Sequence, residues 1–226
     1  MINPATNIMP FLYDLARNNN KPWFDANRER YTTAANDFSQ MITDLIERLS
    51  DTDNSIVGVT AKQSIYRIYR DLRFSHDKTP YKTHFSANIA VGGKSSIKSG
   101  FYIQLEPEMS MCGGGLWIED KNILKTVRNE LALVPEDLIE ILEKQSFRKF
   151  YPDGLWDYQK LKKVPSGYDV NAPYADLLKY KHFIATAYIT DNQLSKSDLY
   201  DYIAAAHREI YPMLQLFNSI LEDAGY

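Results

Sequence analysis

The 226-residue sequence contains only one cysteine, Cys112. A lone cysteine excludes an intramolecular disulfide and is typical of proteins in a reducing compartment. No apolar run approaches the roughly 18 residues that a membrane-spanning helix needs. The N-terminal residues also lack the basic stretch and apolar core of a secretion signal. We therefore expect a cytoplasmic protein with no membrane partner.

The sequence also has no excess of positive charge: it contains 26 basic and 29 acidic residues, and its net charge is −3. This balance argues against broad, non-specific binding to nucleic acid, for which a basic domain is usual. The four histidines form neither an H-x-x-x-H pair nor a Cys/His set, so no zinc site is predicted. The sequence also lacks a P-loop and a dinucleotide-binding fingerprint, and we predict no cofactor.

The sequence shows no internal repeat, low-complexity segment or linker, and its length favours a single domain over residues 1–226. Apolar residues at helical spacing predict helices over about 8–17, 22–50, 119–131, 135–145 and 173–181. The second of these is long for a globular protein, and we expect a break near Asn36. Ser195, with Asp198 three residues on, predicts the start of a final helix, which Pro212 should kink.

The middle of the chain is rich in β-branched and aromatic residues separated by turn signals. Short strands are predicted over about 65–73, 85–91, 101–106, 109–112, 116–118 and 183–189. Strands that cluster centrally, with helices before and after them, predict an α+β fold in which helices flank an antiparallel central sheet. Gly113-Gly-Gly115 falls between two of these strands. It predicts a bulge or a tight turn, where glycine permits close backbone approach.

A basic segment between residues 67 and 82 holds the most concentrated chemistry. It combines five cationic side chains with two carboxylates, inside a chain of negative net charge: Arg67, Arg70, Arg73, Lys78 and Lys82, with Asp71 and Asp77. Such a cluster is typical either of an ion-pair network or of a site for an anion.

The segment begins with the composition of a strand, in which side chains alternate between two faces. Arg67, Asp71 and Arg73 then share one face, and Arg70 lies on the other. An arginine fork can hold a carboxylate in two parallel hydrogen bonds. Asp71 would orient Arg67 or Arg73 in this way while the remaining donors face a ligand. A helical interpretation groups Arg67, Arg70, Asp71 and Phe74 instead.

Residues 76–82 have the pattern of a loop, because Asp77 can bond to the backbone that follows it and a proline keeps its preceding residue extended. The loop would bring Lys78, Tyr81 and Lys82 back over the arginines. Cationic donors together with a tyrosine hydroxyl suit a phosphate, sulfate or carboxylate group.

The pattern Arg-x-x-Arg-Asp-x-Arg-Phe-x-x-Asp-Lys-x-x-Tyr, from Arg67 to Tyr81, resembles the signature of the DUF2461 family of mostly bacterial proteins. Further stretches are similar to that family: Phe11-Leu, Trp23-Phe24, the run from Gly113 to Trp117, and Val164-Pro-Ser-Gly-Tyr168. The resemblance covers nearly the whole chain. It implies a single domain and points to the same residues. It implies no reaction, cofactor, substrate or catalytic residue, because the function of the family is unknown.

Three interpretations of the basic segment stay open. In the first, Arg70 and Arg73 clamp a phosphate-bearing or other anionic small molecule, with or without catalysis, and Lys78 and Tyr81 close the loop over it. The second is a nucleic-acid or protein interaction module that uses the same basic and aromatic surface, although the acidic remainder of the chain weakens its nucleic-acid form. In the third, the segment is purely architectural, and its Arg–Asp pairs hold a loop to a sheet.

Two further residue types have competing interpretations. His76 and His84 bracket the loop, and either can be a general base near a phosphoester or a solvated loop histidine. Cys112 can be a nucleophile, for which no partner base is evident, or a small buried hydrophobic residue. Neither pattern assigns a catalytic residue.

Overall fold

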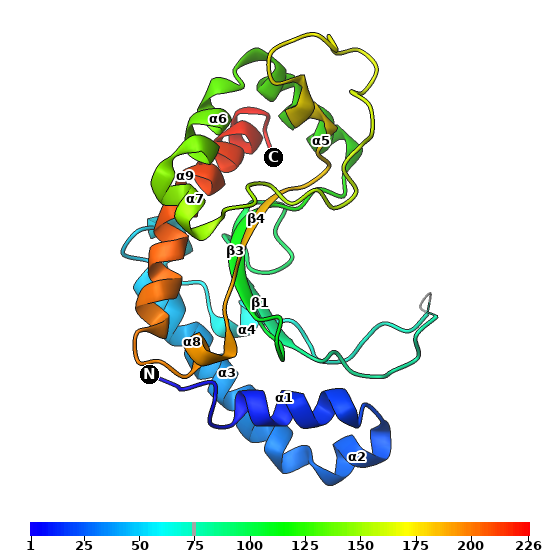
Figure 1. Cartoon of the computed structure of the whole chain (residues 1–226), viewed down its shortest axis with the longest axis vertical. Coiled ribbons are helices and arrows are strands. Elements are labelled where there is room, and N and C mark those ends of the chain that lie inside the picture. The colour runs from blue at the N-terminus through cyan, green and yellow to red at the C-terminus, as the bar shows by residue number, and fades with distance from the viewer. Residues whose placement is uncertain (74–75) are drawn as a thin grey trace. The chain divides into compact units, whose positions relative to one another are not determined.

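The computed structural model describes residues 1–73 and 76–226 (Figure 1). Its α-helices are α1 (Ile8–Arg17), α2 (Lys21–Ala26), α3 (Arg28–Leu49), α4 (Ala61–Ser64), α5 (Lys121–Leu133), α6 (Glu136–Glu143), α7 (Gln145–Phe150), α8 (Asp191–Leu194) and α9 (Leu199–Asp223). Short 3-10 turns occur at η1 (Asn54–Ile56) and η2 (Ala175–Lys179). Among the described residues an antiparallel sheet has the order β1 (Phe85–Ile89), β2 (Gly100–Leu105), β3 (Met111–Leu116) and β4 (Phe183–Tyr188). The predicted α+β fold class is confirmed.

The chain divides into two compact units. The first unit contains Met1–Lys94, Tyr102–Cys112 and Tyr188–Ala204, and the second contains Ser95–Phe101, Gly113–Ala187 and Ala205–Tyr226. Strand β1 and most of β2 belong to the first unit, while most of β3 and β4 belongs to the second. The basic segment lies in the first unit, and that unit therefore positions the candidate site. A single domain over the whole chain stays a prediction.

In the first unit, α1 and α3 pack against one face of β1. The ring of Phe85 on β1 is stacked on Phe38 of α3, with centroids 5.4 Å apart, and on Phe11 of α1 at 6.2 Å. Ala87 and Ile89, at alternate positions of the same strand, complete this buried face. Removing these large rings from water supplies the unit with a hydrophobic core. The opposite face of β1 is left for more polar side chains.

The helix predicted over 22–50 is two helices, and the break falls at Asn27 rather than near Asn36. The Asn27 side chain donates to the Trp23 carbonyl at 2.9 Å, which satisfies a group that the end of α2 leaves unpaired. Asn36 lies inside α3. A single asparagine there lowers helix stability by only a fraction of a kcal/mol, and the apolar residues continue at helical spacing on both sides of it. The predicted start is confirmed, because Asn20 caps α2 by accepting the Trp23 N–H at 3.0 Å.

Residues 65–73 and 76–84, which we call the arm, run out and back as two limbs (Figure 1). An antiparallel bridge joins Tyr69 with Tyr81, and backbone hydrogen bonds continue the pairing on both sides of it. The limbs are extended but form only isolated bridges, so the strand prediction is confirmed in part. The helical interpretation is wrong for the described part of the segment.

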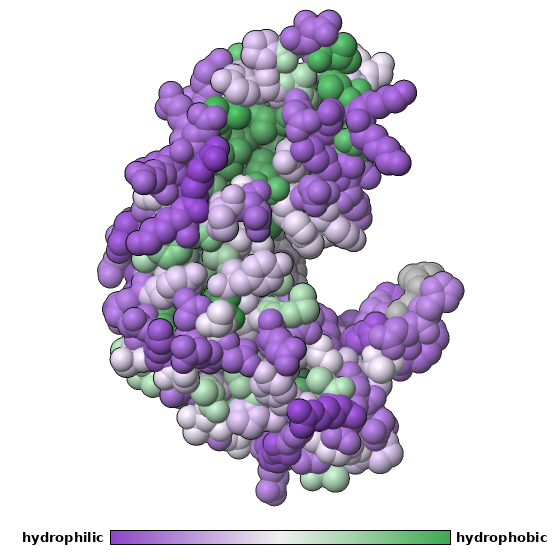
Figure 2. All heavy atoms as spheres, in the orientation of Figure 1, coloured by the Kyte–Doolittle hydropathy of each residue, from purple (hydrophilic) through white to green (hydrophobic). Residues whose placement is uncertain are grey.

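Exposed and covered side chains alternate along the outgoing limb of the arm, as they do in a strand. Arg67, Asp71 and Arg73 are exposed, whereas Ile68 is buried and Arg70 is partly covered. Figure 2 shows hydrophilic side chains on both sides of the residues drawn in grey. The arm therefore presents a polar surface while its base is tied to the core.

In the second unit, β3 runs without interruption through its three glycines, so the predicted tight turn is wrong. The predicted close approach is confirmed. A Cβ added to Gly113 would lie 2.1 Å from the carbonyl oxygen of Ala185, and one added to Gly115 would lie 1.9 Å from that of Phe183. Only glycine lets β3 lie so near the backbone of β4.

The last helix starts later than predicted. Ser195 ends α8, and α9 begins at Leu199. The capping box that forms lies upstream, where Thr190 and Gln193 bond to each other's backbone N–H groups and start α8. Pro212 lies within α9, and the kink there stays a prediction.

Candidate functional site

Arg70 holds the two limbs of the arm together. Its guanidinium forms an ion pair with Asp77 and bonds to the hydroxyl and the carbonyl of Thr79. The Asp77 carboxylate also accepts the Thr79 backbone N–H at 2.9 Å, as predicted for a loop-forming aspartate. This backbone hydrogen bond, followed by the contact with Arg70, lowers the pKa of Asp77 to about 2. Arg70 and Asp77 therefore close the arm.

Arg73 and Asp71 form a separate, exposed pair. Arg73 Nη2 lies 2.7 Å from Asp71 Oδ2 and Arg73 Nε lies 3.0 Å from Asp71 Oδ1, which is the two-bond geometry of an arginine fork. These contacts lower the pKa of Asp71 to about 2. Lys78 donates to the Leu72 carbonyl at 3.0 Å. Arg70 and Arg73 thus pair with different carboxylates, and a clamp of the two on one anion stays a prediction.

Tyr81 belongs to the core of the first unit. It is only 4% exposed, and its ring is stacked on that of Phe24. The side chain of Asn19 bonds to both its backbone N–H and its carbonyl, at 3.1 and 2.8 Å. Burial raises the pKa of its hydroxyl. Tyr81 therefore anchors the base of the arm and is not placed to close over a ligand.

Arg67 and Lys82 lie on neighbouring limbs of the arm, and neither has a carboxylate partner among the described residues. The Lys82 ammonium lies 5.4 Å from the centre of the Tyr66 ring, which is a cation–π contact. Desolvation and, after it, repulsion from Arg67 lower the pKa of Lys82. Asp71 is near enough for Arg67 to help lower its pKa, but among the described residues no carboxylate lies within ion-pair distance of either cation.

A hydrogen-bond network follows the polar face of β2 and the residues after it. The Tyr102 hydroxyl donates to Gln104 Oε1 at 2.6 Å, and the Gln104 amide donates to Glu106 Oε2 at 2.7 Å. Glu106 Oε1 accepts the Thr83 hydroxyl at 2.6 Å, and His84 Nδ1 lies 3.7 Å from Glu106 Oε2. We call these four hydrogen-bonded residues, together with the neighbouring His84, the Glu106 network.

The Glu106 network lies close to Tyr66 of the arm. Burial raises the pKa of Tyr102, and the neighbouring Tyr66 adds to that shift. Interaction with His84 is the main cause of the lowered pKa of Glu106. Sequence reasoning found only His84 of this network. The signal for the others was the strict alternation of Tyr102, Gln104 and Glu106 with large apolar residues, which marks one polar face of a strand.

The other predicted residues have simpler environments. Phe74, the phenylalanine of the arginine-rich pattern, lies outside the described residues. His76 is exposed. Cys112 is fully buried, and burial raises the pKa of its thiol to about 12. Because the thiolate is the reactive form of cysteine, this environment supports the hydrophobic interpretation and not the nucleophile.

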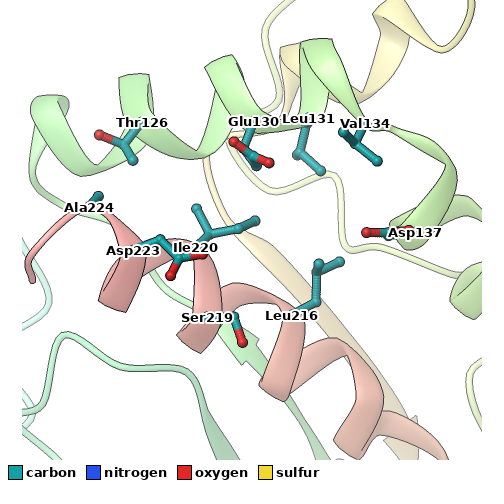
Figure 3. A pocket seen from close by; sticks show the side chains of 10 residues that line it. All are labelled: Thr126, Glu130, Leu131, Val134, Asp137, Leu216, Ser219, Ile220, Asp223 and Ala224. Atoms are coloured by element: carbon teal, nitrogen blue, oxygen red, sulfur yellow. The ribbon is translucent and has the colours of Figure 1, made fainter.

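The second unit contains a pocket of about 340 Å³ between α5 and α9 (Figure 3). Leu131 and Ile220 contribute to its apolar lining, and the charged residues that line it are all acidic: Glu130, Asp137 and Asp223. An acidic lining repels the kind of ligand that the basic segment suggests. This pocket is therefore not a candidate for the anion site that the basic segment predicts.

Within residues 1–73 and 76–226, no group of three or more His, Cys, Asp or Glu side chains is placed to hold a metal ion. No helix in the same part of the chain is long and apolar enough to cross a membrane.

A family model described as "Conserved hypothetical protein (DUF2461)" matches residues 7–216. The chain belongs to the DUF2461 family. This confirms the resemblance inferred from the pattern between Arg67 and Tyr81. No curated protein and no solved structure matches the chain. The DUF2461 description states no activity, so a function for this member has to be argued from its own contacts and charges.

Proposed function

We propose that this DUF2461 protein binds a phosphate-bearing or other anionic small molecule at the arm of its first unit. The negative group of the ligand lies between Arg67 and Lys82, beside the ring of Tyr66. The guanidinium of Arg67 can offer two parallel N–H donors to a phosphate, and the ammonium of Lys82 offers three rotatable ones.

The observation that carries the proposal is the position of Lys82. It is half-buried next to Arg67, and no carboxylate of the described residues pairs with either side chain. A charge taken out of water is unfavourable unless a counter-charge or hydrogen bonds compensate it. An anion between the two side chains removes their mutual repulsion and supplies that compensation.

Arg70 and Arg73 have supporting roles in this proposal, in place of the clamp predicted from the sequence. The Arg70–Asp77 pair closes the arm and so keeps Arg67 and Lys82 on adjacent limbs. The Arg73–Asp71 pair is exposed and lies further along the outgoing limb. Loss of either pair would change the shape of the arm, and it would affect ligand binding only through that change.

We further propose that the protein hydrolyses a bound phosphoester, with His84 of the Glu106 network as the general base. His84 follows Lys82 by two residues, and Glu106 lies against its ring. A histidine oriented by a carboxylate is a common general base, and one beside a bound phosphoester can take a proton from an attacking water. His84→Gln should then abolish turnover of a phosphoester while leaving its binding intact.

The proposal is tested by thermal shift with inorganic phosphate, sulfate, pyrophosphate, AMP and glucose 6-phosphate. We expect at least one of these to raise the Tm of the wild type, and Arg67→Ala or Lys82→Met to abolish the increase. Loss of one charged hydrogen-bond partner should weaken binding by about 1.5–3 kcal/mol. Lys196→Ala, which removes an exposed cation elsewhere in the first unit, is the control for net charge. An increase that survives both arm variants contradicts the proposal.

A second candidate function rests on Tyr69, which is exposed on the same limb as Arg67. An exposed aromatic ring beside cations suits a base of single-stranded nucleic acid. Binding of that kind weakens steeply with salt because it releases counterions from several phosphates. A short oligonucleotide that binds with a steep salt dependence, and that loses affinity in Tyr69→Ala, would favour this function over a small-molecule site.

A further inference from the structure

Three exposed aromatic side chains gather on the second unit, near the end of β3 and beside β4. Trp117, Trp156 and Tyr158 are 47%, 46% and 43% exposed, although rings of this size are usually well buried. Trp156 and Tyr158 are stacked, with centroids 4.9 Å apart and 20° between their planes. Tyr158 and Trp117 are 5.8 Å apart with 25° between theirs. We call these three residues the aromatic patch.

The buried His182 supports Trp117 from one side. The two rings are 3.9 Å apart and nearly parallel, at 13°. His182 Nδ1 accepts the Ile118 backbone N–H at 3.2 Å, which places the proton of the neutral ring on Nε2. Burial, with Lys181 nearby, lowers the pKa of His182, so the ring is neutral near pH 7. Nε2 is itself buried without a partner among the described residues, and the flat neutral ring fixes the plane of Trp117.

One face of Trp117 is left open by these rings. Tyr158 is almost equally far from Trp117 and from His182, at 5.8 and 6.0 Å, whereas those two are only 3.9 Å apart. Tyr158 therefore lies beside the Trp117–His182 pair and not on top of it. His182 covers one face of Trp117, yet the side chain is still 47% exposed, so the face turned away from His182 can receive a ring-shaped ligand. Tyr158 and Trp156 extend the surface sideways.

We propose that the aromatic patch is a carbohydrate-binding site, in which a neutral sugar ring stacks on the open face of Trp117. The C–H groups on one face of a pyranose carry partial positive charge and complement the negative face of an aromatic ring. The hydroxyls around the sugar need hydrogen-bond partners. Glu119, which accepts the Trp117 indole N–H at 3.4 Å, has acceptor capacity to spare for them.

The charges beside the rings favour a sugar over a nucleobase as the stacked group. Two carboxylates, Glu119 against Trp117 and the exposed Asp157 between Trp156 and Tyr158, lie beside the rings, and the cation Lys181 lies near His182. Carboxylates at these positions repel the phosphates that accompany every base of a nucleic acid. A neutral glycan has no such penalty. This site is also distinct in chemistry from the anion site proposed on the first unit.

The test uses the whole chain with maltohexaose, cellohexaose, chitohexaose and a short single-stranded oligonucleotide as probes, followed by NMR of the three indole N–H signals. We expect at least one hexasaccharide to shift the signals of Trp117 and Trp156 and to leave that of Trp23 in place. The oligonucleotide should leave the signals of Trp117 and Trp156 in place. Trp117→Ala and Trp156→Ala should each weaken hexasaccharide binding roughly tenfold. Tyr188→Ala, which removes an exposed tyrosine of the first unit, should not change it.

A wild-type protein in which the signals of Trp117 and Trp156 respond to no hexasaccharide overturns the proposal, and so does a response of these two signals to the oligonucleotide alone. An equal loss of affinity in Tyr188→Ala would show a general surface effect and overturn it as well. If Trp117→Ala fails to fold, the wild-type shifts together with Trp156→Ala decide the question, because Trp156 lies at the outer edge of the patch.

Discussion

The ring of Tyr81 lies parallel to that of Phe24, with 3.9 Å between their centroids and 12° between their planes. This contact joins the returning limb of the arm to α2, and Asn19 strengthens it with two hydrogen bonds to the Tyr81 backbone. Lys82 follows Tyr81 directly. The packing of an uncharged ring in the core thus determines where a cation of the candidate site is held.

Truncation of this anchor should be costly. We expect Tyr81→Ala to lower the free energy of unfolding by about 3–5 kcal/mol, because it removes a fully packed ring. Tyr81→Phe keeps the ring and should cost less than about 1 kcal/mol. Urea denaturation of both variants measures the difference. Equal effects of the two substitutions would show that the hydroxyl, and not the stacked ring, holds the arm.

The closure of the arm should depend on pH through Asp77. Its pKa in the folded protein is about 2, below the value of roughly 3.9 for an unperturbed aspartate. A lowered carboxyl pKa contributes stability that is present above pH ~4 and is lost as the pH falls through the folded pKa. NMR titration should show Arg70 and Thr79 signals changing between about pH 4 and 2, and Asp77→Asn should remove that transition. A measured Asp77 pKa near 3.9 would contradict the ion pair.

Gly115 should tolerate no side chain. Its φ is +134°, and a Cβ there would overlap the Phe183 carbonyl oxygen at 1.9 Å. We expect Gly115→Ala to cost about 3 kcal/mol or more, because β3 would have to move away from β4. Gly58→Ala is the matched control, since Gly58 also has a positive φ, of +86°, but open space around it. It should cost only about 1 kcal/mol of backbone strain. Thermal unfolding of the two variants compares these costs.

The thiol of Cys112 should be inert in the folded protein. It is completely buried, and its pKa of about 12 leaves almost no thiolate at neutral pH. A thiol reagent such as DTNB should react with the protein only after denaturant is added. Rapid reaction of the native protein with the reagent would contradict this prediction and make Cys112 a candidate nucleophile again.

Local patterns in the sequence predicted much of the fold. The helix at 8–17 is found as predicted, and α5 and α6 lie within two residues of their expected bounds. Alternation predicted which side chains of the arm share a face, because that depends only on an extended backbone. The break at Asn27 was missed, since asparagine is tolerated both inside helices and at their ends.

The pairings of the candidate site could not be read from the sequence in the same way. Whether Arg70 or Arg73 faces Asp77 depends on the register between the two limbs, and the Tyr69–Tyr81 bridge and the Phe24 ring set that register. Both are tertiary contacts. The Glu106 network likewise joins residues of β2 to the segment before β1, although its alternating polar face was visible in the sequence.

The pKa of Lys82, measured by NMR on selectively labelled lysine side chains without and with saturating pyrophosphate, is the strongest test of the proposed anion site. In the free protein this pKa should lie below the usual value of 10.5, and Arg67→Ala should raise it by removing a neighbouring charge. Pyrophosphate should raise it in the wild type, because a bound anion stabilises the protonated amine. A Lys82 pKa that starts at the usual value, or that does not respond to pyrophosphate or any other anion that binds, would contradict an anion site between Arg67 and Lys82.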